Sequence, residues 1–159
     1  MRGFTVVELV VALALVGILT FVALSRTGST DAFAQQAAGN ELAAAMRHAQ
    51  KTAVARRAAV YVRIDTVAGS VRFCLDAAPT CAQPVLQPGS TDPLRFDAAA
   101  GVALALNPST ATVIVFDGLG RVPGTSVQVV DLTLAGSAGS AAVRTWTQTG
   151  LTEASWTGS

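Results

Sequence analysis

The chain has 159 residues, of which 51% are hydrophobic and 13% charged, and its formal net charge is +1. This length suits a single domain with a short additional segment. A nearly neutral chain has no overall basic excess with which to hold nucleic acid by counterion release. The single histidine, His48, lies far from the two cysteines in the sequence, which argues against a metal centre.

The N-terminal stretch is the most informative part of the sequence. Residues 4–24 contain one charged residue, Glu8, and only two polar uncharged residues, Thr5 and Thr20. As a helix, this run would be about 31 Å long, which is enough to cross the hydrocarbon core of a bilayer. A carboxylate costs about 2.5–3.5 kcal/mol at mid-bilayer on insertion scales, so Glu8 predicts a role beyond simple anchoring.

The same stretch resembles the type III signal of type IV prepilins and type II secretion pseudopilins. The matching residues are the short basic leader Met1-Arg2, then Gly3, the bulky apolar Phe4, and Glu8 as the fifth residue of the mature chain. The resemblance implies that a prepilin peptidase cuts after Gly3 on the cytoplasmic side and methylates the new amino terminus at Phe4. It also implies that Glu8 meets the terminal amine of a neighbouring subunit. Pairing the two charges offsets much of the cost of burying each, so the pair would select the axial register of a filament.

Two other readings of the N-terminus remain open. A secretory signal peptide would end at a small-residue site such as Ala23-Leu24-Ser25, but its apolar core is normally about 7–15 residues long. An ordinary signal anchor would need neither Gly3 nor Glu8. Both alternatives predict that the chain is not cut after Gly3.

A second helical segment should follow the apolar run. The cluster at residues 28–31 is expected to loosen the helix, with one of its polar residues as an N-cap. Further on, small and apolar residues recur with helical spacing and predict a buried stripe, formed by Leu42, Ala45, Met46, Ala49 and Ala53. Basic residues fall largely off this stripe, and we expect His48 at the surface.

After Arg57 the apolar period changes from that of a helix to that of a strand. Val60, Val62 and Ile64 alternate with polar residues, and a turn at residues 66–70 leads to a partner strand. Further strands are predicted at residues 94–96, 102–106, 112–116, 127–134 and 143–147. Residues 77–93 are expected to form an irregular loop, residues 135–142 a flexible hairpin tip, and the tail around Trp156 a frayed end.

One helical region followed only by short strands predicts an α+β fold, with the helix packed on an antiparallel sheet or on a pair of sheets. Cys74 and Cys81 lie close together in the sequence. If the domain is exported, they are expected to form a disulfide that closes a small loop, although two free thiols remain an alternative.

The order of elements resembles one pilin branch, the GspH/FimT family of H-type pseudopilins and FimT- and FimU-like minor pilins. The similar stretches are residues 42–57, with the Leu-x-x-Ala pattern and the basic turn, and residues 116–122, with the Gly-Arg turn. The resemblance implies a leader at 1–3, a transmembrane and filament-core helix at 4–25, a periplasmic amphipathic helix at 26–57 and an antiparallel β domain at 58–159.

A DNA-binding minor pilin for DNA uptake is the alternative function. Some FimT-like pilins carry a C-terminal Gly-Arg-x-Arg element, but here Gly150 is followed by no arginine and Glu153 lies nearby. Arg121 and Arg144 are the remaining candidates for phosphate contact, and two scattered arginines are a weak footprint. No catalytic set, cofactor motif or metal-ligand spacing stands out in the sequence.

The resemblance implies a minor pilin or pseudopilin that primes or caps a filament. A minor subunit is favoured because the cysteines are central, whereas major pilins usually have a C-terminal disulfide loop. The resemblance implies a single-pass protein of the bacterial inner membrane with a periplasmic domain. The expected partners are other pilins, the prepilin peptidase, the inner-membrane assembly platform and, before assembly, lipid. The resemblance does not distinguish a subunit of the type II secretion pseudopilus from a subunit of a type IV pilus.

Overall fold

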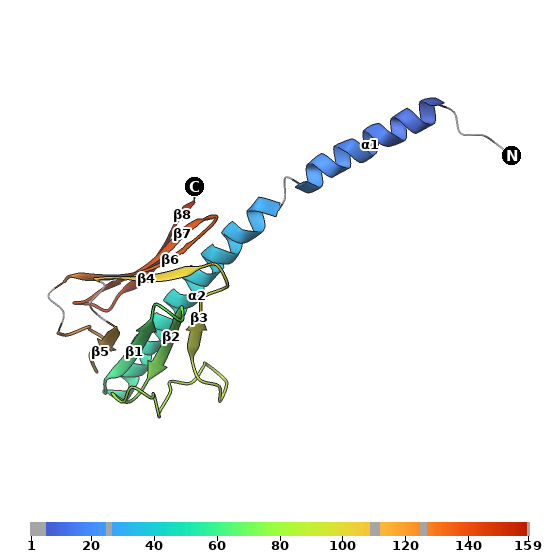
Figure 1. Ribbon diagram of the computed structural model, residues 1–159. Coiled ribbons are helices and arrows are strands. Elements are labelled where there is room, and N and C mark those ends of the chain that lie inside the picture. The colour runs from blue at the N-terminus through green and yellow to red at the C-terminus, as the bar shows by residue number, and fades with distance from the viewer. Residues whose placement is uncertain (1–5, 25–26, 109–111, 125–126, 159) are drawn as a thin grey trace.

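The computed structural model describes residues 6–24, 27–108, 112–124 and 127–158. Two helices begin the chain, α1 (Val6–Leu24) and α2 (Thr27–Arg56). Figure 1 shows α1 beyond the N-terminal end of α2 and away from both sheets, whereas α2 runs along the sheets. The helical region therefore has one half without a sheet to cover it and one half that carries the body of the protein.

Helix α2 forms because its small and apolar residues make a stripe of helical period. All five residues of the predicted stripe, from Leu42 to Ala53, are buried. The helix ends in a Schellman motif, in which Ala58 N donates to Ala53 O at 3.2 Å and Arg57 N donates to Val54 O at 3.2 Å. Arg57 takes the left-handed conformation at φ 50° that this motif requires.

The expected loosening at residues 28–31 is not found. Helix α2 begins at Thr27 and continues through Gly28 and Asp31 to its end at Arg56. The polar residues of this cluster therefore lie inside the first turns of the helix instead of capping it. Gly39 and Asn40 do not interrupt the helix either.

The first sheet has the strand order β3-β2-β1-β5, and its pairs are antiparallel. Its strands are β1 (Val60–Asp65), β2 (Ser70–Cys74), β3 (Arg95–Asp97) and β5 (Val113–Phe116). Alternate residues of β1 are buried, as the period of the sequence predicts: Val60, Val62 and Ile64 face the core. The β1–β2 hairpin is confirmed.

The second sheet has the order β4-β6-β7-β8 and is also antiparallel. Its strands are β4 (Ala103–Asn107), β6 (Val129–Gly136), β7 (Gly139–Trp146) and β8 (Thr152–Gly158). Two expectations for this region are wrong. Residues 135–142 are mostly strand, with only Ser137 and Ala138 between β6 and β7, and the tail is no frayed end because β8 pairs with β7 along its length.

Both sheets and α2 share one hydrophobic core. Small residues let the helix approach the second sheet closely: a Cβ added at Gly39 would lie 2.7 Å from the Cβ of Ala141 in β7. The predicted α+β class, with a helix packed on a two-sheet domain, is confirmed. Of the two helices, α2 is the one that packs against the two sheets.

Candidate functional site

Helix α1 presents an apolar surface to its surroundings. Val6 is 78% exposed, Val7 72% and Leu13 64%, and Glu8 lies in the first turn of the same helix. Large exposed apolar surfaces mark sites of contact with membranes or other proteins. Gly3 and Phe4, the predicted processing residues, lie outside the described residues.

Among the described residues, no helix is both long enough and apolar enough to cross a membrane.

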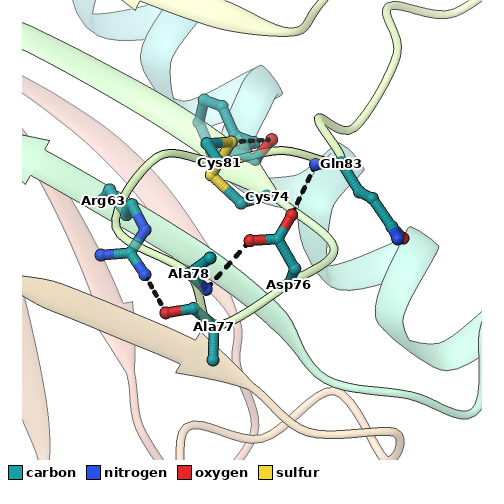
Figure 2. Close-up of a disulfide and its surroundings, with 8 residues drawn as sticks. Arg63, Cys74, Asp76, Ala77, Ala78, Cys81 and Gln83 are labelled. Carbon is teal, nitrogen blue, oxygen red and sulfur yellow. Dashed lines mark hydrogen bonds between the residues drawn. A yellow bond between two sulfur atoms is a disulfide. The ribbon is translucent and has the colours of Figure 1, made fainter.

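The disulfide loop is the best-defined feature of the first sheet (Figure 2). Cys74, the last residue of β2, is bonded to Cys81, with 5.3 Å between their Cα atoms. The Asp76 carboxylate accepts hydrogen bonds from the backbone N–H groups of Ala78 and Gln83, so one side chain organises both halves of the loop. The disulfide expected from the sequence is present, and it fixes a loop over the outer face of the sheet.

Contacts beyond the disulfide hold this loop region to the rest of the body. Arg63 of β1 donates from Nη2 to the carbonyl of Ala77, as Figure 2 shows. The part expected to be irregular also pairs locally with the sheet, since Val85 N donates to Phe73 O at 2.8 Å. His48 lies partly exposed at the surface, and its Nε2 lies 3.2 Å from Leu86 O.

Arg121 belongs to a closed turn after β5. The Asp117 carboxylate accepts hydrogen bonds from Arg121 N at 2.8 Å and from Arg121 Nε at 3.1 Å. Burial alone would raise the pKa of Asp117, but the hydrogen bonds from Arg121 and Leu119 outweigh it and hold this pKa below its ordinary value. Arg121 therefore already has a carboxylate partner.

Arg144 is also paired. Its Nε lies 2.9 Å from Asp131 Oδ1 in the neighbouring strand β6, and this hydrogen bond raises the pKa of the guanidinium. Arg144 and Arg121 lie in different parts of the fold, β7 and the turn after β5. The structure thus gives each predicted phosphate contact its own aspartate and does not join the two into one basic patch.

Close backbone contacts explain the glycines around Arg121. Gln50 of α2 donates from Nε2 to Gly120 O and to Thr149 O, both at 2.9 Å, and so joins two turns to the helix. Gly150 has φ +67°, and a Cβ there would overlap the carbonyl oxygen of Gly120. The Gly-Leu-Gly-Arg segment is therefore a packing element against the end of α2.

Three arginines that the sequence did not single out lie side by side on the first sheet. Arg63 pairs with Arg72 across β1 and β2, and Arg72 pairs with Arg95 across β2 and β3. We call these residues the arginine row. Part of this row could have been predicted from the sequence, because a hairpin with a turn at residues 66–69 places Arg63 opposite Arg72.

The described residues contain no group of three or more histidine, cysteine, aspartate or glutamate side chains that could hold a metal ion. Their ion pairs lie at the surface of the body: Arg95–Asp97, Arg121–Asp117 and Arg144–Asp131. The main surface features of the described residues are therefore an apolar helix, a cross-linked loop and a row of guanidinium groups.

The comparisons with known proteins agree with this picture. A search of curated protein sequences finds no match. Two crystal structures of the type IV minor pilin FimU of Pseudomonas aeruginosa have a similar fold. One has a TM-score of 0.56 and 20% identity, and covers 79% of this chain and 91% of the FimU chain. The other has a TM-score of 0.53 and 19% identity, and covers 76% and 91%.

A family model is more specific. The model of the type II transport protein GspH matches residues 38–150, which is more than half of the chain. The matched range includes most of α2, the whole first sheet and strands β4, β6 and β7 of the second sheet. The chain belongs to the GspH family, and its body is that of a pilin-like protein.

Proposed function

We propose that this chain is a minor pilin or pseudopilin subunit that is cut after Gly3, methylated at Phe4 and assembled into a filament through helix α1. The observation that carries the proposal is the contrast within one helical region. Val6, Val7 and Leu13 of α1 are exposed, whereas the stripe from Leu42 to Ala53 of α2 is buried against the sheets. A helix that stays outside its own domain is suited to pack against lipid first and against other subunits afterwards.

Glu8 sets the axial register in this proposal. It lies in the first turn of the described part of α1 and is the only charged residue between Phe4 and Leu24. In an apolar filament core, a carboxylate and an ammonium are each expensive alone, and pairing offsets much of that cost. The ammonium would be the methylated terminal amine at Phe4 of a neighbouring subunit.

The proposed location follows from the same segment. Residues 4–25 would lie in the inner membrane, and residues 26–159 would lie in the periplasm, where the Cys74–Cys81 bond persists. The proposed partners are the prepilin peptidase, the inner-membrane assembly platform and other pilins or pseudopilins. We propose a minor rather than a major subunit because its disulfide is in the middle of the chain, and as a minor subunit it would prime or cap the filament.

The test is to follow processing and assembly separately in the native host. Glu8→Ala and Glu8→Gln should leave cleavage after Gly3 intact, because the cleavage site lies several residues earlier, but should strongly reduce recovery of the subunit in sheared filaments. Glu153→Gln, which removes an exposed carboxylate of β8, is the matched control and should assemble like the wild type. Normal incorporation of Glu8→Ala would remove the register role.

The DNA-uptake alternative gains no support from the two arginines on which it depended. Arg121 and Arg144 are each paired with an aspartate, and a paired guanidinium contributes less to a phosphate-binding field. We therefore do not propose DNA binding through these residues.

A further inference from the structure

The outer face of the first sheet carries the arginine row. Partners in register lie on the same face of a sheet, so Arg63, Arg72 and Arg95 project to one side. The residues adjacent to them in sequence, Val62, Val71 and Phe96, are buried in the core, which places the arginines on the opposite face. Three cationic side chains therefore stand next to one another across three neighbouring strands.

This arrangement works against folding. Side chains directly opposite in an antiparallel sheet have Cβ atoms about 4.5–5.5 Å apart, and like charges at this separation destabilise the pair. From residue 58 onward the chain has seven acidic residues and five arginines. Acidic side chains could therefore have stood opposite these arginines and neutralised them. A like-charged row in an acidic body indicates a use other than stability.

The nearby carboxylates neutralise the row only in part. Asp97 forms an ion pair with Arg95, and Asp65 accepts hydrogen bonds from Val67 N and Ala68 N in its own turn. Arg63 is held by the carbonyl of Ala77, yet its Nε is buried without a hydrogen-bond partner among the described residues. Arg72, in the middle of the row, is exposed and has no carboxylate partner within the described part of the chain.

Hollows flank Arg72 on both sides. One, of about 400 Å³, is lined by Arg72, Arg95 and Asp97 together with the apolar residues Pro84, Pro93 and Leu94. The other, of about 360 Å³, is lined by Arg63 and Arg72 with Asp65, Pro79 and Val113, so each hollow has two arginines against one aspartate. The disulfide loop contributes Cys81 to the first hollow and Pro79 to the second, so the cross-link shapes both.

We infer that this face binds a segment of another protein that carries a carboxylate next to an apolar side chain. A guanidinium is matched to a carboxylate because its planar fork can donate two parallel hydrogen bonds. The apolar lining of the larger hollow takes the neighbouring side chain, which the phosphodiester backbone of nucleic acid does not supply. Neither hollow has an exposed aromatic side chain on which a base would stack.

The binding test uses the full-length chain in a nonionic detergent and a fluorescent synthetic peptide in which glutamate and leucine alternate. Anisotropy should report binding that weakens as salt is added. Arg72→Gln should weaken binding about tenfold, the effect of losing one charge-assisted hydrogen-bonded contact. Arg56→Gln, which removes an exposed charge at the end of α2, should leave binding unchanged.

Two further probes identify what the face recognises. The same peptide with glutamine in place of glutamate should bind at least about tenfold more weakly, because the guanidinium then loses its charged acceptor. A short DNA duplex should compete poorly. No peptide binding at low salt, equal binding of the glutamine peptide, or stronger binding of the duplex with the same dependence on Arg72 would each overturn the inference.

Thermal unfolding separates a binding role from a structural one. Since Arg72 lies between two like charges, Arg72→Gln should unfold at the same temperature as the wild type or at a higher one. A loss of several degrees would show that Arg72 is retained for stability, and would overturn the inference. None of these outcomes depends on cleavage after Gly3 or on Glu8, so the inference and the proposed function fail separately.

Discussion

Helices α1 and α2 follow each other in the chain, but the exposed apolar residues at the start of α1 contrast with the buried stripe of α2. In α1, Val6 and Leu13 are 78% and 64% exposed, whereas in α2 both Leu42 and Met46 are 0% exposed. The difference shows that burial in the domain, and not hydrophobicity, tells which apolar residues stabilise the fold. The apolar residues of α1 are left for a different environment, and substitutions in the two regions should have different consequences.

The largest contrast is expected between a core residue and an exposed apolar residue. Phe73→Ala should lower the free energy of unfolding by about 3–5 kcal/mol, because it removes a fully buried ring and leaves a cavity. Leu13→Ala should leave unfolding of the body unchanged. Thermal unfolding of both variants in the same detergent checks this, and equal losses would mean that α1 contributes to the core.

Glycines give a second contrast. Gly150→Ala should cost at least about 2 kcal/mol, because the residue has φ +67° and its Cβ would overlap the carbonyl of Gly120. Gly17→Ala in α1 meets nothing within 4 Å and should favour the helix by up to about 1 kcal/mol. Denaturant unfolding measures the first effect and circular dichroism of α1 the second. A harmless Gly150→Ala would contradict the close contact between the two turns.

The disulfide gives a third test of the difference between α1 and the body, because both of its cysteines lie in the body. Replacing Cys74 and Cys81 together by Ala should lower stability by at most about 2–3 kcal/mol, since the closed loop is short. The unfolding temperature of the body should fall, while the helix content of α1 stays the same. Reduction of the wild type should reproduce the shift, and a wild type insensitive to reductant would show that the bond contributes nothing to stability.

The smallest effect is expected at Asp117. Its folded-state pKa lies below the ordinary carboxyl value, so its contribution is complete above about pH 4 and is lost as the pH falls through the lower folded-state pKa. Asp117→Asn should therefore cost about 1 kcal/mol at neutral pH, and this difference from the wild type should disappear in strong acid. Unfolding curves of both proteins at several pH values test the sign of this pH dependence. A stability difference between wild type and variant that grows in acid would contradict it.

Sequence periodicity was sufficient to predict the buried faces where apolar and polar side chains recur with a clear helix or strand period. The stripe from Leu42 to Ala53 and the alternation of Val60, Val62 and Ile64 both correspond to buried faces. Prediction from periodicity failed where the strands are built from small residues. Residues 135–142 have low strand propensity, but all except Ser137 and Ala138 pair along β6 and β7, and Ala141 is small because Gly39 of α2 packs closely against it. That requirement comes from the helix and is not visible within the strand sequence.

The candidate site residues were predictable to different degrees. The disulfide could be predicted because Cys74 and Cys81 are close in the sequence, and Arg121 and Arg144 could be named as charges. Their partners Asp117 and Asp131 could not, because the pairing depends on turn conformation and on strand register. The arginine row depends on the register of three strands, of which only the β1–β2 hairpin could be inferred in advance.

The most direct test of the account is the intact mass of the native protein extracted from the membranes of its host, with and without reduction. We predict a chain that begins at Phe4, carries one added methyl group and gains the mass of two hydrogen atoms when the Cys74–Cys81 bond is reduced. A chain that retains Met1, or one that begins near Arg26, would contradict the central claim that α1 is the assembly helix of a processed filament subunit.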